Sequence, residues 1–143
     1  MKAVLLSVHI LAAVILIGPI TVAASLFPRY ARSAAAAADP RESPAVPVAA
    51  AMHRISHGYT IPALAVPAFG IALAAAMSVL MQPWVLVSMA LTAAAAFLLA
   101  ALINPAQARA LHALDTSEPV ADTMAKPLRN LAMNTGFFAL MWT

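Results

Sequence analysis

Long apolar stretches separated by short polar segments make up most of this chain. A membrane-spanning helix needs about 20 mostly apolar residues, and the pattern predicts spans over residues 3–27, 48–81, 84–104 and 128–143. The second of these starts with an amphipathic, interfacial part and becomes uniformly apolar at Ile61. We therefore expect an all-α fold with four transmembrane helices in an antiparallel bundle, both termini outside, and all 143 residues in one membrane domain.

Prolines and the length of the last run add detail to this prediction. Gly18-Pro19 predicts a kink in the first span, and Pro62 and Pro67 predict one in the second. Residues 131–143 make roughly 20 Å of helix, whereas the hydrocarbon core is about 30 Å thick. Either the fourth helix is a short span in a locally thinned bilayer, or the chain stops before its natural C-terminus. The missing polar flank favours the second interpretation.

Positively charged residues indicate the orientation. They gather after the first and third spans, whereas the connection between the second and third spans has no charge. Because positively charged loops stay in the cytoplasm, loops one and three are expected there, in a bacterial inner membrane. Tyr30 and Tyr59 then fall at the inner interface, and Trp84 and Trp142 at the outer one. The first run is longer than the apolar part of a signal peptide, about 7 to 15 residues, so we expect it to remain as a span.

Composition narrows the classes of function. Hydrophobic residues make up 64% of the chain and charged residues 9%, against about a quarter charged in soluble domains, which excludes a soluble enzyme and a disordered chain. Eight Lys and Arg against five Asp and Glu leave no basic patch for nucleic acid. The lack of Cys excludes disulfides and thiolate metal sites. Proton relays need ionisable groups inside the membrane, but every carboxylate falls in a loop: Asp39, Glu42, Asp115, Glu118 and Asp122.

Four histidines are the candidate ligands for a cofactor or metal: His9, His53, His57 and His112. His9 has apolar neighbours and is expected to hydrogen-bond to another helix. A haem b would need His9 opposite His57, but helix geometry puts them about 27 Å apart in depth, so we expect no cofactor. A zinc site from His53, His57 and His112 lacks a carboxylate or Cys partner. The simpler interpretation is that His53 and His57, which share a helix face, belong to a polar collar at the membrane interface.

Small residues mark the expected packing faces. Helices in lipid associate through close packing of small side chains. Gly70, Ala74 and Ser78 repeat at four-residue spacing in the second span, and Ala93 and Ala96 lie in an Ala-rich part of the third. We expect one of these faces to lie against another helix, either of this chain or of a neighbouring subunit.

The opening "SVHILAAVILIGPITVAASLFPRYAR" combines a His in the first turns, a Gly-Pro break and basic residues after the span. It resembles small four-helix integral membrane proteins of actinobacteria, and the closing "RNLAMNTGFFALMWT" is similar to their last span. One protein of that type is an accessory subunit of the aa3-type cytochrome c oxidase in the respiratory supercomplex. The resemblance implies a non-catalytic subunit without a cofactor, whose partners are other membrane subunits and lipid.

We therefore expect an accessory, structural subunit of a respiratory chain complex and not an enzyme. Two alternatives stay open. One is a membrane anchor that binds haem b or a quinone through His9 or His57, and the other is a small transport protein.

Overall fold

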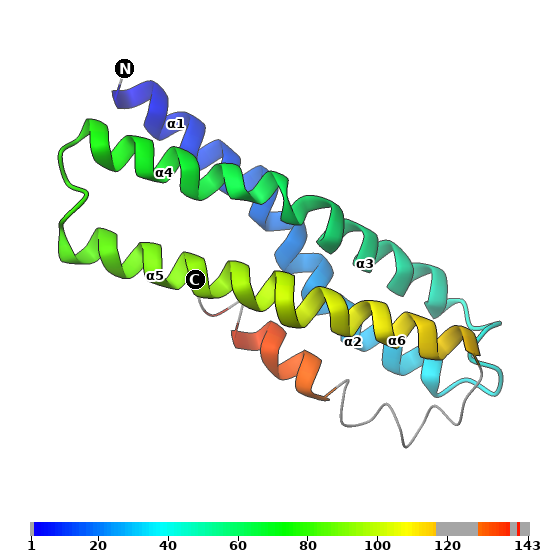
Figure 1. The fold of residues 1–143 in the computed structure, drawn as a ribbon. Helices are drawn as coiled ribbons and strands as arrows, with labels where there is room; N and C mark the ends of the chain where they lie inside the picture. The colour runs from blue at the N-terminus through cyan, green and yellow to red at the C-terminus, as the bar shows by residue number, and fades with distance from the viewer. Residues whose placement is uncertain (1, 117–128, 138–139, 141–143) are drawn as a thin grey trace.

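The computed structural model describes residues 2–116, 129–137 and 140, and every regular element within them is a helix. The predicted all-α fold is therefore confirmed for the described part of the chain. Figure 1 shows long helices lying side by side, with the N-terminus at one end of the molecule.

Three helices dominate the structure: Lys2–Ala35, Ala45–Ala76 and Pro83–Thr116. With 34, 32 and 34 residues, each is long and apolar enough to cross a membrane. Of the expected fourth span (128–143), residues 129–137 are helical. Most of the remainder lies outside the described residues.

The first long helix is continuous but irregular. It consists of α1 (Lys2–Ala12), a π turn (Ala13–Ile17) and α2 (Gly18–Ala35). The wide turn directly precedes Pro19, which has no N–H to continue the α-helical pattern. The helix then runs through a buried Pro28, past the end of the apolar run that predicted it.

The second long helix consists of α3 (Ala45–Thr60), a 3₁₀ turn (Pro62–Leu64) and α4 (Ala65–Ala76). The tight turn begins at Pro62, one of the two prolines expected to disturb this helix, and Pro67 follows in the first turn of α4. Prolines inside membrane helices are tolerated because local 3₁₀ or π turns adjust the backbone bonding.

The third long helix consists of α5 (Pro83–Phe97), a π turn (Leu98–Ile103) and α6 (Asn104–Thr116). The sequence pattern predicts that the third span ends at residue 104. In the structure the segments before and after this residue form one helix. The π turn directly precedes the proline, so the wide turn again adjusts the backbone where a donor is missing.

The core lies at the end of the molecule where α2, α3 and α6 meet, whereas α1 contacts α4 at the other end (Figure 1). Small residues let α2 and α3 approach closely, and five of these are Ala24, Ala31, Ala34, Ala45 and Ala49. Larger side chains complete this core: Phe27, Ile103 and Leu114. Within the described chain, α5 buries only Val85 and Ala95. The tightest packing therefore lies beside segments that the sequence pattern assigns to loops.

Candidate functional site

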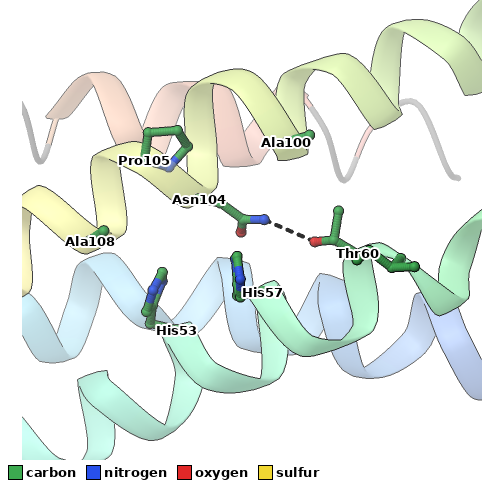
Figure 2. Close-up of a pocket in the computed structure, with 8 residues that line it drawn as sticks. His53, His57, Thr60, Ala100, Asn104, Pro105 and Ala108 are labelled. Carbon is green, nitrogen blue, oxygen red and sulfur yellow. Dashed lines mark hydrogen bonds between the residues drawn. The ribbon is translucent and has the colours of Figure 1, made fainter.

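A cavity of about 310 Å³ lies between α3 and α6. Its walls combine polar and small apolar side chains: His53, His57, Thr60, Ile61, Ala100, Asn104, Pro105 and Ala108. His53, His57 and Thr60 lie on one face of α3, because residues four and three apart on a helix share a face. Figure 2 shows the two imidazoles of α3 directed toward α6, and the amide of Asn104 directed back toward α3. The space is therefore a half-open cavity between two helices, mostly apolar but with several polar side chains in its wall, and it is called the polar cavity below.

Hydrogen bonds fix several of these side chains. The Thr60 hydroxyl donates to the Ser56 carbonyl oxygen at 2.7 Å. Asn104 Nδ2 donates to Thr60 Oγ1 at 2.9 Å (Figure 2). His53 Nδ1 donates to Gln107 Oε1 at 3.1 Å. The last two bonds join α3 to α6 across the cavity.

Three buried polar atoms around this site have no hydrogen-bond partner in the described part of the chain: Ser56 Oγ, Asn104 Oδ1 and Gln107 Nε2. Ser56 and Gln107 are fully buried, and Asn104 is 7% exposed. An unpaired buried polar group costs about 1–3 kcal/mol. A native structure has few such groups, and each needs an explanation.

The imidazole of His57 makes no hydrogen bond in the described chain, but it stacks on the ring of His53. The two ring centroids are 5.9 Å apart and the planes meet at 30°. In Figure 2, the Asn104 amide oxygen lies on the side of the amide that faces His57. The His57 side chain is exposed and forms one wall of the cavity.

An apolar chamber of about 170 Å³ adjoins the polar cavity. The two spaces share Thr60, Ile61 and Ala100. The other residues of the chamber wall are apolar except for Thr92, which brings a hydroxyl group. They are Ile17, Ala63, Leu64, Pro67, Thr92, Ala96 and Leu99. All of these residues belong to the apolar runs, whereas two residues of the polar cavity, His53 and Ala108, are followed in the sequence by the exposed Arg54 and Arg109. The pair of spaces therefore passes from the polar end of the helices into their apolar part.

His9 lies elsewhere, between α1 and α4. Its Nδ1 donates to the Val66 carbonyl oxygen at 3.0 Å, so the expected hydrogen bond to another helix is present. A Cβ atom at Gly70 would lie 3.0 Å from His9 Cε1, so the glycine makes room for the ring.

The position of His9 corrects one estimate from the sequence. Val66 follows His57 by nine residues, about 14 Å of helix, so the estimated depth difference of about 27 Å is too large. The reason is that α1 packs against the first turns of α4. His9 and His57 are still not brought together, because His9 bonds to Val66 and His57 lines the polar cavity.

The structure does not form the zinc site considered for His53, His57 and His112. No group of three His, Asp or Glu side chains within the described residues could hold a metal ion. His112 is exposed and does not line the cavity that His53 and His57 share. It lies two turns beyond Asn104 on α6, which explains the separation.

The small residues expected to mark packing faces have different surroundings. Gly70 lies against the His9 ring, and Ala74 is buried. Ser78 is exposed beyond the end of α4, with a φ of 59°. Ala93 is exposed on α5, and Ala96 lines the apolar chamber.

Sequence reasoning missed Thr60, Asn104 and Gln107. Asn104 was interpreted only as the end of a span. A usable signal is present: Thr60 continues the spacing of His53 and His57, and Gln107 follows Asn104 by three residues on the helix that faces them. The pairing of α3 with α6 was not predictable, because the sequence pattern treats the start of the second span as interfacial and assigns most of α6 to a loop.

Comparison with known protein families, with curated proteins and with solved structures found no match.

Proposed function

We propose that this chain is a small integral membrane protein that binds an amphiphilic small molecule between α3 and α6. The observation that carries the proposal is the adjoining pair of spaces, one polar with an unpaired buried amide oxygen and one apolar. Small-molecule sites are typically clefts of about 300–1,000 Å³ with mostly apolar walls and a few convergent polar groups. The polar cavity holds the ligand's polar group, and the chamber takes its apolar part.

The position of the two spaces along the helices supports this arrangement. His53 and Ala108 of the polar cavity are followed in the sequence by Arg54 and Arg109, where the uniformly apolar stretches of the two helices have ended. The chamber lies inside those runs. An amphiphile in a bilayer has the same order, with its polar group at the interface and its chain in the hydrocarbon core.

The charge of the walls restricts the ligand. Among the described residues, no Lys, Arg, Asp or Glu lines either space. A phosphate would need Arg or Lys partners, and a cationic amine would need a carboxylate. The ligand's polar group is therefore uncharged.

Ala100 offers a direct test because it lines both spaces. Purified protein should carry a lipid-soluble compound that solvent extraction and mass spectrometry detect. Ala100→Phe should remove that compound by filling the shared wall. Ala90→Phe, at an exposed position of α5 outside both spaces, should retain it. Equal retention by both variants, or no specific compound in the natural protein, would contradict the proposal.

The exposed small-residue face of α5 favours a second, compatible role. We propose that the chain is also an accessory subunit of a larger respiratory complex in the bacterial inner membrane, in agreement with its resemblance to oxidase subunits. Ala93 is exposed, and small residues gain little against lipid but let another helix approach. Ala93→Leu should reduce co-purification with the partner subunits, whereas Leu91→Ile, at another exposed position of α5, should not. Unchanged co-purification of Ala93→Leu would contradict this role.

A further inference from the structure

We infer that the ligand of the polar cavity is a quinol, the reduced form of a lipid-soluble quinone, whose hydroxyl groups donate to Asn104 and His53. This inference rests on the proposed function and adds the chemical class of the ligand. It follows from which atoms around the cavity are donors and which are acceptors.

Thr60 fixes the orientation of the Asn104 amide. The single hydroxyl proton of Thr60 is committed to the Ser56 carbonyl, so Thr60 Oγ1 has only lone pairs to offer to Asn104. Asn104 must therefore turn its NH₂ group toward Thr60. Its carbonyl oxygen is left as a buried acceptor without a donor in the described chain.

The opposite wall of the cavity also presents an acceptor. His53 uses its Nδ1–H to donate to Gln107 Oε1. In a neutral imidazole the other nitrogen then carries a lone pair. In Figure 2 the His53 ring is directed from α3 toward α6, one turn beyond His57, and the Asn104 amide is directed from α6 toward α3.

Two acceptors on opposite walls require a ligand with a donor at each end. An oxidised quinone brings only carbonyl acceptors, which match neither wall. A quinol has the same flat ring but carries a hydroxyl donor at each end. The cavity volume of about 310 Å³ is at the lower limit of small-molecule sites, which suits a single substituted ring. The adjoining chamber accommodates the start of the apolar tail.

His57 controls access to the Asn104 oxygen. The oxygen is buried on the side that faces the His57 ring (Figure 2). The His57 ring stacks on His53 and makes no hydrogen bond in the described chain, so a hydroxyl group reaches the oxygen only when this ring turns aside.

The test compares three probes with the same decyl tail: a benzoquinol, the matching benzoquinone and decanol. The full chain is placed in phosphatidylcholine nanodiscs under anaerobic conditions, and the retained probe is extracted and quantified. The quinol should be retained about tenfold better than the quinone, the ratio expected for one buried hydrogen bond of about 1.4 kcal/mol. A preference for the quinone would overturn the inference.

Variants at Thr60 test whether Thr60 fixes the orientation of the Asn104 amide. Thr60→Val removes the acceptor that orients Asn104, so the amide is free to turn its NH₂ group to the ligand. The preference for quinol over quinone should then fall to about one, whereas Thr60→Ser should keep it. Asn104→Leu should abolish the preference, and Thr92→Val, in the chamber wall, should leave it unchanged. Thermal unfolding of each variant identifies misfolding. If Asn104→Leu does not fold, the comparison of Thr60→Val with Thr60→Ser still shows whether the quinol preference depends on the orientation of the amide. An unchanged preference in Thr60→Val would overturn the inference.

The same probes distinguish failure of the proposed amphiphile site from failure of the quinol assignment. Equal retention of decanol, quinol and quinone, lost in Ala100→Phe, would support an amphiphile site but overturn the quinol assignment. Retention of no probe by the natural chain, together with no extracted native compound, would overturn both.

Discussion

Polar side chains within the apolar part of this molecule are positioned by individual neighbours. His9 is the clearest case, because its hydrogen bond to the Val66 carbonyl depends on the missing side chain at Gly70. Two helices are thereby joined by one imidazole. In lipid, such interhelical bonds between polar groups contribute about 0.6–2 kcal/mol.

Gly70→Leu should displace the His9 ring and destabilise the protein by about 1–3 kcal/mol, the usual cost of overpacking. Unfolding by SDS in mixed micelles measures this change. Gly58→Leu is the matched control, because a Cβ at Gly58 would meet nothing within 4 Å. The cost of Gly70→Leu should shrink in a His9→Ala background, since the clash then disappears. An equal cost in both backgrounds would show that the two residues are not coupled.

Removing the Ser56 hydroxyl is expected to have the opposite effect on the stability of the protein. The side-chain oxygen of Ser56 is fully buried and has no partner in the described chain. Removing an unpaired hydroxyl removes its desolvation cost, so Ser56→Ala should leave stability unchanged or raise it by about 1 kcal/mol. The same SDS titration measures it. A loss of more than about 1 kcal/mol would show that the hydroxyl has a partner in the membrane-embedded protein.

The helices themselves were predictable where hydrophobicity alone defines them. The apolar runs predict four spans, and the described part of the chain has three helices long and apolar enough to cross a membrane. The continuation of two helices through Pro28 and Pro105 was not predictable, because it depends on packing between distant segments. The core contacts of α2, α3 and α6 stabilise helical turns that proline alone would disfavour. The candidate site was missed for the same reason, since Asn104 and Thr60 meet only once α3 and α6 are paired.

Substitutions at two alanines of α3 test whether α3 packs closely on α2. Ala49 is fully buried, and Ala51 is exposed on the same helix. Ala49→Leu should destabilise the protein by about 1–3 kcal/mol, whereas Ala51→Leu should change stability by less than about 0.5 kcal/mol. SDS unfolding of the two variants, side by side, compares them. Similar effects at both positions would contradict the packing of α2 on α3.

At the scale of the whole molecule, the orientation in the membrane is a proposal that rests on charge. Arg29 and Arg32 lie near the end of α2, Arg41 lies in the segment between α2 and α3, and Arg109 lies in α6, whereas the connection between α4 and α5 carries no charged residue. The positive-inside rule then puts the α2–α3 connection in the cytoplasm.

The absence of Cys from the chain makes this orientation easy to measure. Ser33 and Gln82 are exposed and belong to opposite ends of the long helices. In intact spheroplasts, a membrane-impermeant maleimide should label Gln82→Cys and should reach Ser33→Cys only after permeabilisation. The reverse labelling pattern would invert the proposed topology.

The length of the helices has a consequence for the lipid environment. A helix of 34 residues is about 51 Å long, whereas the hydrocarbon core measures about 30 Å. If the uniformly apolar stretches span the hydrocarbon, as proposed, the polar cavity lies at their end, where hydrophobic mismatch acts. A thicker bilayer draws His53 and Asn104 under that surface and removes the water that competes for their hydrogen bonds. Occupancy of the cavity should thus rise with lipid chain length, so that this protein's ligand binding reports the thickness of the membrane around it.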